Sequence, residues 1–532
     1  LIHYFSDMKK IIFLFIFCCS FSIIGKSQTY QQKLNSFMKM LDTYYVDSLN
    51  MDSIVEVGIE KILSGLDPHS VYMNKKELEK ANEPLVGNFE GVGIQFNILD
   101  DTILVLHTIS GGPSKRVGIM DGDRIIFIND EKVAGTGIDN DGVFKRLRGS
   151  KGTEVRLRIY RTGEPELLGF LVIRDKIPLF ALDAHYLAAP GLGYIKLSRF
   201  SATATDEVVA AIDELKQKGA KNFILDLCGN SGGYLNQAFA LSDQFLDGEK
   251  LIVYTEGKSQ RRENFNATEQ GAFQEGKLVV MIDQGSASAS EIVSGAIQDW
   301  DRGILVGRRT FGKGLVQKAY SLPDQSAVRL TMARYYTPSG RSIQKSYKGG
   351  QDQYRDELGE RYESGELYDA SKVKILDSTK YYTSSKRVVY GGGGVMPDIY
   401  VAMDTNWISK YYGKLIRSGV FNSFTIQYVD KNRKELEAKY QTVEQLKSKF
   451  IIDKTLLDEF YAFAKLKNIT HDNEDFYNSL EMIKTQLKAL IARNIWDENA
   501  YFYIFNDQNE IYQEALEIMG EKKIFKKNKI KS

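Results

Sequence analysis

The chain has 532 residues, of which 43% are hydrophobic and 26% are charged, and its formal net charge is +1. This length predicts two or three domains with extensions, and the composition is ordinary for a folded soluble protein. A net charge so close to zero produces no global field that would attract nucleic acid, so we expect no nucleic-acid partner.

Residues 1–27 predict a signal peptide whose true start is Met8. Two lysines follow this methionine, an apolar run occupies 11–24, and small residues precede the expected cleavage point near Ser27. The apolar run is shorter than the ~20 residues that a membrane-spanning helix needs. We therefore expect export to the periplasm or cell envelope, with a retained anchor as the alternative. Cleavage leaves Cys228 as the sole cysteine, which excludes an intramolecular disulfide.

Residues 28–85 predict helices, because apolar side chains recur at helical spacing, and the stretch LDPHSVYM (66–73) interrupts them as a turn. Residues 86–174 predict a compact domain of short strands and glycine turns, which has a normal size for a module. The expected strands of this domain are 91–98, 102–109, 123–130 and 154–161, and its expected short helices are 113–119 and 140–148.

Residues 175–402 change to a strand–helix rhythm, which predicts an α/β sheet core. The polar, tyrosine-rich segment 346–390 is interpreted as an insertion on the surface of this core. Residues 403–532 predict a helical extension that forms a dimer or partner surface, with a basic tail that is solvated and frayed or, alternatively, lies on a membrane surface. The expected core strands are 194–200, 222–227, 277–283 and 303–307, and the expected core helices are 205–219, 234–246 and 288–300.

The histidines are too scattered for a metal site of the H-E-x-x-H kind, because none lies three or four positions from another. We expect neither a metal nor an organic cofactor. A Ser-His-Asp enzyme is disfavoured as well, since no histidine lies near a serine-bearing turn of the α/β region. The five residues are His3, His69, His107, His185 and His471.

The segment DQGSASASEIVSGAIQDW (283–300) places serines between the end of a predicted strand and the start of a helix. A serine at such a junction meets the positive end of the helix and free backbone N–H groups, which together stabilise an oxyanion. Helix capping and small-residue packing are the alternative explanation. A nucleophile also needs a base, and in the absence of histidine the available type is a buried lysine.

Lys313 lies in GRRTFGKGLVQ (307–317), which almost matches a phosphate-binding loop but has Gly314 where that loop has Ser or Thr. The following residues favour a strand, whereas a phosphate loop opens a helix, so nucleotide binding is disfavoured. To act as a base the lysine needs its pKa to fall by ~3 from ~10.4, which burial promotes. In an extended strand Gln317 shares a face with Lys313 and can orient its amine.

The chain resembles the carboxyl-terminal processing proteases, tail-specific serine peptidases in subfamily A of peptidase family S41, with a Ser–Lys dyad and an embedded PDZ domain. The resemblance implies an α/β protease core of crotonase-like or ClpP-like type, an inserted α+β, β-sandwich-like PDZ domain and a helical C-terminal extension. The matching stretches occur in the family's order across about 60–400; they are LDPHSVYM, FEGVGIQF, GGPSKRVGIMDGDRIIFINDE, LRGSKGTEVRLRIYR, DLCGNSGGYL, GSASASEI, GRRTFGKGLVQ, YYTPSGRSIQ and GVMPDI.

The resemblance also implies roles for single residues. Ser288 is similar to the family's nucleophile, Lys313 to its general base and Gln317 to the residue that positions the lysine. Asp299 matches an acid that has been proposed as a third catalytic member. We interpret Asp299 as structural, because a carboxylate beside the lysine would raise the pKa of the amine.

The glycine turn of the family supplies an oxyanion donor, and Gly232 and Gly233 resemble it. The backbone N–H of Ala289 is the expected second donor. The chain departs from the family at Cys228, where arginine is usual, and at Ser231, where proline is usual. Both changes leave backbone donation intact but put the rigidity of the turn in question.

The stretch FEGVGIQF predicts a site for a peptide's terminal carboxylate, because its glycines free backbone N–H groups for hydrogen bonding. The strand that follows is expected to accept the peptide by β-addition. A plain hairpin turn explains a lone GxG equally well, but the following PSKRVGIMDGDRIIFIND favours a PDZ domain. The carboxylate-binding residues are expected to be Gly91, Val92, Gly93 and Ile94.

Taken together, these patterns predict an exported serine endopeptidase of the carboxyl-terminal processing type, whose partners are proteins or peptides with free C-termini. The alternative from another class is a catalytically silent PDZ scaffold that only binds peptides. The intact Ser288, Lys313 and Gln317 argue against the scaffold, because a binding module gains nothing from all three. Nucleotide binding at Lys313 is a third alternative.

Overall fold

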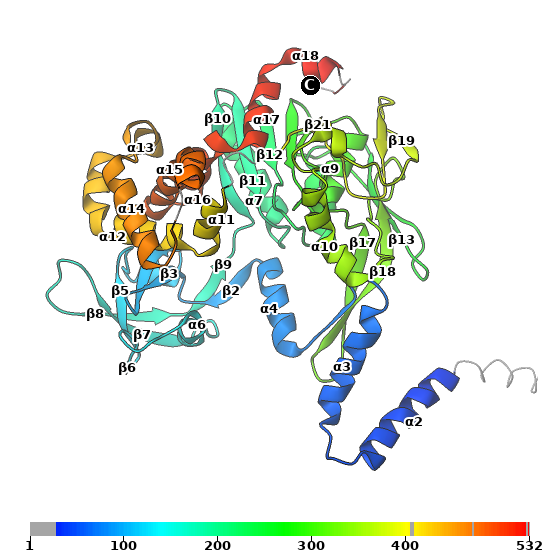
Figure 1. Ribbon diagram of the computed structural model, residues 1–532, viewed down its shortest axis with the longest axis horizontal. Coiled ribbons are helices and arrows are strands. Elements are labelled where there is room, and N and C mark those ends of the chain that lie inside the picture. Colours follow the sequence, from blue (N-terminus) through cyan, green and yellow to red (C-terminus); the bar gives the residue numbers. More distant parts are fainter. Residues whose placement is uncertain (1–27, 405–408, 471–472, 528–529, 531–532) are drawn as a thin grey trace, which may run out of the picture. The chain divides into compact units, whose positions relative to one another are not determined.

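The computed structural model describes residues 28–404, 409–470, 473–527 and 530 (Figure 1). The predicted signal peptide lies outside these residues. The chain divides into two compact units, 1–72 and 73–532, and each is considered by itself.

The described part of the first unit is helical, as predicted, with α2 at Gln28–Tyr44 and α3 at Met51–Ser64. Asn50 caps α3 by accepting a hydrogen bond from the backbone N–H of Ser53 at 3.3 Å. The predicted turn after α3 is held by Asp67, whose carboxylate accepts hydrogen bonds from backbone N–H groups two and three residues further on. The turn leads into β1 (Val71–Met73).

The second unit begins with α4 (Lys75–Val86), which is followed by a six-strand antiparallel sheet in the order β3-β4-β5-β7-β8, with β6 paired to β5 beside this path. Its inward side chains alternate with exposed ones, most clearly along β7, and pack beneath two short helices. Strand β3 lies at the edge of the sheet. The elements are β3 (Ile94–Leu99), β4 (Thr102–Thr108), β5 (Arg124–Ile128), β6 (Glu131–Lys132), β7 (Glu154–Tyr160), β8 (Leu168–Ile173), α5 (Pro113–Arg116) and α6 (Asn140–Leu147).

The strands and helices expected in this domain are confirmed, while β8 is an additional strand. Two further strands connect the domain to the rest of the unit. Strand β2 (Asn88–Gly91) pairs antiparallel with β9 (Asp175–Pro178), so the chain enters and leaves the domain side by side. The strand pairing therefore continues a few residues beyond the predicted boundary at 174.

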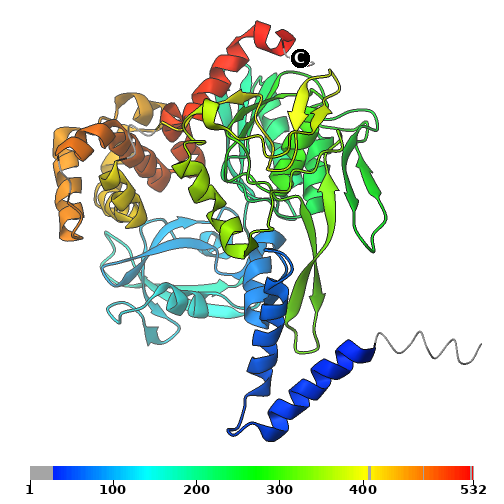
Figure 2. The same ribbon diagram turned by 45° about the vertical axis from the view of Figure 1, so that its right-hand side comes forward.

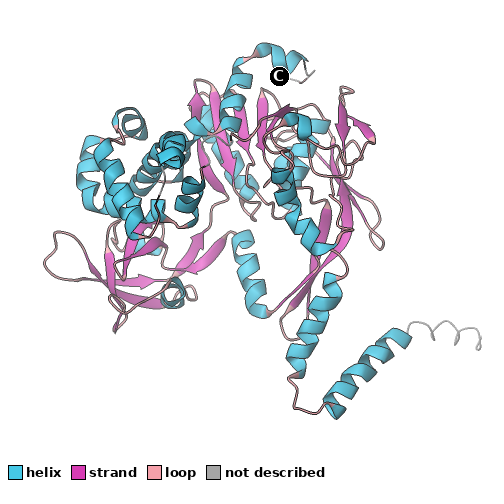
Figure 3. Ribbon diagram, viewed as in Figure 1, coloured by secondary structure: helices cyan, strands magenta, loops and turns pink. Residues whose placement is uncertain are grey.

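The core of the unit is a six-strand sheet in the order β10-β11-β12-β15-β16-β21, parallel except for β10 (Figure 3). Its strands from β11 to β16 are almost wholly buried, as expected when helices cover both faces. The strands are β10 (Leu182–Ala189), β11 (Leu192–Leu197), β12 (Asn222–Asp226), β15 (Leu278–Ile282), β16 (Ile304–Gly307) and β21 (Ile399–Tyr400).

Three helices cover one face of this sheet: α7 (Ala204–Gln217), α8 (Leu235–Asp243) and α9 (Ala289–Asp299). The other face is covered from the far end of the chain by α17 (Glu510–Gly520), whose Ile511, Tyr512 and Ile518 pack against sheet residues (Figure 1). The prediction that all of residues 403–532 form an extension is therefore wrong for α17, which belongs to the core. The expectation of a frayed tail is also wrong at Phe525 in α18 (Lys522–Lys527), which is 1% exposed.

The remaining C-terminal helices form a bundle with its own apolar core, which agrees with the predicted helical extension (Figure 2). They are α11 (Lys410–Arg417), α12 (Val420–Lys439), α13 (Val443–Lys449), α14 (Lys454–Leu466), α15 (Asn473–Ile495) and α16 (Glu498–Phe505). Within the described ranges, no helix combines the length and the apolar character needed to cross a bilayer.

Most residues of the predicted surface insertion are exposed, but a few buried side chains anchor it to the unit. Its helix α10 (Gly350–Glu363) carries Tyr354 and Arg361, which are 4% and 3% exposed. Among its charged side chains, Arg361 and Glu366 are buried and pair with each other at 2.9 Å. A smaller sheet beside it contains β13 (Leu251–Glu256), β14 (Glu263–Asn266), β17 (Leu315–Ser321) and β18 (Ala327–Tyr336), and the insertion also forms β19 (Lys380–Tyr382) and β20 (Val388–Tyr390).

We predict that Asp226→Ala destabilises the core by about 3–5 kcal/mol, because it leaves a buried ammonium without its partner. Asp226 ends β12 and accepts hydrogen bonds from the Tyr194 hydroxyl at 2.6 Å and from the Lys196 ammonium at 3.1 Å. The measurement is the free energy of unfolding in urea. Exposed Glu269→Ala is the control and should change it by less than about 0.5 kcal/mol; equal effects of the two substitutions would contradict the assignment.

Candidate active site

Ser288 occupies a strained position at the start of α9. Its φ of 55° and ψ of −110° are rare for a residue with a side chain. Such strain costs about 1–3 kcal/mol and persists only where the surroundings enforce it. All 11 residues of α9 are buried, so the helix is a rigid support for this serine.

The neighbouring serines have structural tasks. The Ser286 hydroxyl donates to the carbonyl of Leu227 at 2.8 Å, and the Ser290 hydroxyl donates to the carbonyl of Asn230 at 2.9 Å. Both side chains are fully buried, whereas Ser288 is partly exposed. The structure therefore distinguishes Ser288 from its neighbours on accessibility.

The predicted glycine turn lies directly against Ser288. A Cβ atom on Gly232 would lie 2.9 Å from the Cβ of Ser288 and 3.0 Å from the backbone nitrogen of Ala289. A Cβ on Gly233 would lie 2.2 Å from the carbonyl oxygen of Phe200. Both positions need glycine, because the backbone approaches too closely for a side chain.

The prediction that the backbone N–H of Gly232 is an oxyanion donor is wrong. Its backbone N–H donates to the side-chain oxygen of Asn230 at 2.9 Å and is therefore occupied. No described residue accepts a hydrogen bond from the backbone N–H of Gly233 or Ala289. These two groups are thus available to an incoming oxygen, while Gly232 keeps the turn close to the serine.

Sequence reasoning missed Glu291, a fully buried carboxylate in the first turn of α9. It accepts hydrogen bonds from the backbone N–H groups of Ser288 and Lys313, each at 2.8 Å, and from Gly312 at 2.7 Å. The hydroxyl of Thr310 adds a fourth bond at 2.5 Å. One side chain therefore connects the two predicted dyad residues. The S-x-x-E pattern that begins at Ser288 is the signal that could have revealed it.

The charge of Glu291 is balanced between two opposing effects. Burial raises the pKa of this carboxyl from 4.5 to about 7, and the four hydrogen bonds that it accepts oppose the rise. Tyr335 makes a second link, because its hydroxyl lies within hydrogen-bonding reach of the carbonyl oxygens of both Lys313 and Ser288. Burial raises the pKa of Tyr335 well above its usual value, so the phenol keeps its proton and acts as a donor.

Lys313 precedes β17 and is partly buried. The pairing of β17 with β18 has a β-bulge between Val316 and Gln317, where Met332 of β18 is the extra residue. The Gln317 amide donates to the Thr331 hydroxyl at 3.4 Å. Its role in positioning the lysine stays a prediction.

The phosphate-loop alternative meets a direct obstacle. Such a loop offers its backbone N–H groups to the phosphates. Here the N–H groups of Gly312 and Lys313 are already donated to Glu291. A nucleotide phosphate would have to displace a buried carboxylate to reach them.

Asp299 lies at the end of α9 in a buried ion pair. Its carboxylate accepts hydrogen bonds from the fully buried Arg341 guanidinium at 2.8 Å and from the backbone N–H of Ser339 at 3.0 Å. These contacts support the interpretation of Asp299 as structural. The thiol of Cys228 is equally unsuited to chemistry, because burial raises its pKa well above the usual value.

The predicted carboxylate-binding residues form the loop between β2 and β3. The carbonyl of Val92 accepts hydrogen bonds from the side chain and the backbone N–H of Ser114, at 2.7 and 3.1 Å, and Gly93 has φ of 74°. The loop leads into Ile94 at the start of the edge strand β3. An edge strand has a free row of backbone groups, so the arrangement suits an added peptide strand.

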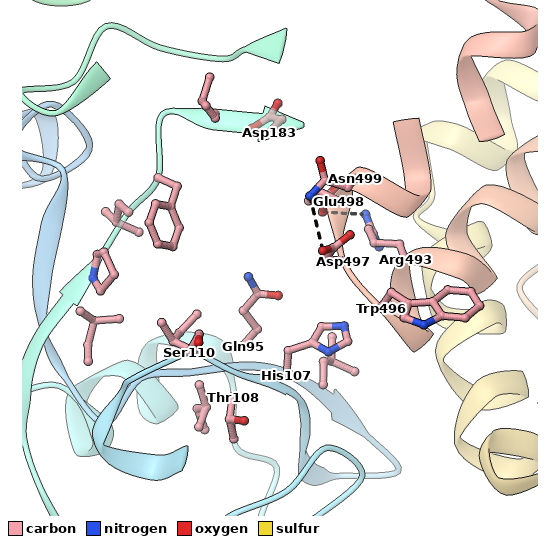
Figure 4. A pocket seen from close by; sticks show the side chains of 18 of the residues that line it. Gln95, His107, Thr108, Ser110, Asp183, Arg493, Trp496, Asp497, Glu498 and Asn499 are labelled. Atoms are coloured by element: carbon pink, nitrogen blue, oxygen red, sulfur yellow. Dashed lines mark hydrogen bonds and ion pairs between the residues drawn. The ribbon is translucent and has the colours of Figure 1, made fainter. Parts of the chain in front are cut away.

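A cavity of about 1340 Å³ lies between three parts of the chain: strands β3 and β4, the region of β10 and α7, and the junction of α15 and α16. Figure 4 shows Gln95 and His107 on one side of this space and Asp497 and Glu498 on the other. Neither Ser288 nor Lys313 lines the cavity, whereas Ile94, Gln95 and Phe96 of the edge strand β3 do. Among the residues that the structure describes, no group of three His, Cys, Asp or Glu side chains is placed to hold a metal ion.

Three family models match parts of the chain. Peptidase family S41 matches residues 191–352, a PDZ domain matches 83–160, and a family of unknown function matches 411–497. A solved structure of a photosystem II D1 C-terminal processing protease is 25% identical, with a TM-score of 0.34, over 69% of this chain and 86% of that chain.

Two curated relatives come from Bacillus subtilis (strain 168). The carboxy-terminal processing protease CtpA is 35% identical over 353 residues, which is 66% of this chain and 72% of the relative. The carboxy-terminal processing protease CtpB is 30% identical over 434 residues, which is 79% of this chain and 89% of the relative. The chain therefore belongs to the carboxy-terminal processing proteases, PDZ-containing serine peptidases of family S41.

Proposed function

We propose that this chain is an endopeptidase that recognises the free C-terminus of a protein through its PDZ domain and cleaves peptide bonds with a Ser288–Lys313 dyad. The observation that carries the proposal is the carboxylate of Glu291, which holds the backbone of both residues at 2.8 Å. The partial exposure of Ser288 between two buried serines supports its role as the nucleophile.

In the proposed reaction the Ser288 oxygen attacks the substrate carbonyl, and its proton passes to the neutral amine of Lys313. The backbone N–H groups of Gly233 and Ala289 stabilise the oxyanion, assisted by the positive end of α9. The Lys313 ammonium then gives its proton to the leaving amine as the peptide bond breaks. Water, deprotonated by the same lysine, releases the acyl group and restores the serine.

Substrate selection is assigned to the loop of residues 91–94 and to the edge strand β3. The terminal carboxylate binds the backbone N–H groups of the loop, and the preceding residues add a strand to the sheet. Export to the periplasm or cell envelope is also part of the proposal and rests on the sequence before Gln28. A homodimer and membrane-surface association remain predictions.

Ser288→Ala and Lys313→Ala should each reduce kcat/KM by about 10³-fold or more, because each removes a reacting group. The measurement is hydrolysis of an internally quenched peptide with a free C-terminus, with the melting temperature as a check on folding. Lys318→Ala is the matched control and should keep full activity, because Lys318 is an exposed lysine of β17, five residues after Lys313. Full activity of either dyad variant would show that the dyad is misassigned.

Amidation of the substrate's C-terminus should lower kcat/KM by about tenfold or more, because it removes charge-assisted hydrogen bonds to the PDZ loop. Acetylation of the substrate's N-terminus is the control, since no role is assigned to that end. An unchanged rate with the amide would remove carboxylate recognition from the proposal and leave the dyad untouched.

Glu291→Gln should lower kcat by about tenfold or more. The amide nitrogen of glutamine would face at least one backbone N–H that now donates to the carboxylate, and the loss of that hydrogen bond would displace the reacting residues. It should also change the pH dependence of stability. The folded pKa of about 7 exceeds the ordinary 4.5, so the native state holds a proton that the unfolded state releases between these values. The free energy of unfolding of the native enzyme should therefore fall as pH rises from about 5 to 7.

The Glu291→Gln variant has no titrating group at this position. Its free energy of unfolding should therefore not show this decrease as pH rises. Urea unfolding of both proteins at pH 5, 6, 7 and 8 measures it. A constant difference between the two proteins across this range would contradict the assignment.

A further inference from the structure

The insertion of residues 346–390 contacts the segment that carries Lys313 through a few buried side chains. The guanidinium of Arg361, from the end of α10, donates to the carbonyl oxygen of Arg309 at 2.6 Å and to that of Thr310 at 3.2 Å. Arg361 is 3% exposed, so no solvent replaces these bonds. A residue about fifty positions away therefore supplies the donors for two backbone carbonyls just before the lysine.

Glu366 fixes this guanidinium. Its carboxylate accepts a hydrogen bond from Arg361 at 2.9 Å and two from Arg309, at 2.7 and 2.8 Å. A carboxylate held by two guanidinium groups has a defined orientation, because the fork geometry of arginine matches its two oxygens. The three side chains thus form a rigid unit in which Arg309 contributes from the lysine segment itself.

Lys345, the residue directly before the insertion, contacts the segment as well, and its partner Glu357 lies in the insertion. The backbone N–H of Lys345 donates to the carbonyl of Gly312 at 2.9 Å, and its ammonium pairs with Glu357 at 3.0 Å. That ammonium also lies 3.8 Å from the ring centre of Phe311. Charged groups of the insertion, together with Lys345, therefore contact residues 309–312.

These contacts divide the backbone of residues 309–313 between two partners. Glu291, from the helix that begins after Ser288, accepts the N–H groups of Gly312 and Lys313. Arg361 of the insertion supplies donors for the carbonyls of Arg309 and Thr310, and Lys345, directly before the insertion, supplies one for Gly312. The position of Lys313 relative to Ser288 is thus determined from both sides, and the insertion provides one of them.

We infer that Arg361, oriented by Glu366, is a positioning residue that holds the Lys313 segment in its working geometry. The inference rests on the proposed function, because it presupposes that Lys313 is the base. Without the guanidinium, two buried carbonyls lose their donors and the segment must shift or admit water. A displacement of about 1 Å near reacting groups costs on the order of 10²-fold in rate.

Arg361→Met keeps most of the buried volume and removes the donors. It should lower kcat by about tenfold or more while KM changes by less than about twofold, because the PDZ domain and its loop are untouched. Admission of water should also make Lys313 harder to deprotonate, so the acid limb of the kcat/KM profile should move to higher pH. The charged groups facing the segment are Glu291, Arg309, Lys345, Glu357, Arg361 and Glu366.

Val389→Ala is the matched control for a purely structural effect. Val389 is buried in β20 of the same insertion and has no role in the contacts to residues 309–313. It should reduce the melting temperature without moving the acid limb. Arg361→Lys is a second variant in case Arg361→Met does not fold; one ammonium cannot reproduce the fork, so its kcat should lie between those of the native and Met proteins.

The inference is overturned if Arg361→Met, or Arg361→Lys where only this variant folds, retains kcat within about twofold. It is overturned equally if kcat of the Arg361 variant falls but the acid limb of its kcat/KM profile lies at the same pH as that of Val389→Ala. The role of Arg361 is then structural only. Lys313→Ala separates this inference from the proposed function. Full activity of that variant removes the dyad, whereas an inactive Lys313→Ala beside a normal Arg361→Met removes only the positioning role.

Discussion

The carboxylate of Glu291 accepts backbone hydrogen bonds from Ser288 and from Lys313, which are 25 positions apart in the chain, and the rest of the candidate site is arranged around it. A buried charge of this kind is tolerated only when its lone pairs are filled, and here four donors fill them. Because these donors belong to the two segments that must meet, the cost of burying the charge is offset by the same contacts that assemble the site.

The surrounding scaffold explains how such precision is maintained. Helix α9 is buried along its whole length, and the parallel sheet beneath it is covered on both faces. The lysine segment, which has no regular structure of its own, depends instead on side chains from the insertion and from Glu291. The predicted nucleophile, Ser288, is therefore positioned by a rigid helix and sheet. The predicted base, Lys313, is positioned by a network of charged side chains.

Much of this architecture could be read from the sequence, because period-2 and helical patterns are local. The strand–helix order of the core and the strands from 91 to 161 followed directly from such patterns. Three features could not be predicted in this way. The bulge before Gln317, the capture of the Gly232 N–H by Asn230 and the burial of Arg361 all depend on contacts that form only in the folded chain.

The last helices have a consequence for the order of events during synthesis. Tyr194 packs beneath Tyr512, so one face of the core sheet stays uncovered until more than three hundred further residues have been made. Newly made chains therefore expose an apolar surface for many seconds, at roughly 5–20 residues per second. That face of the core sheet can therefore close only after α17 has been made.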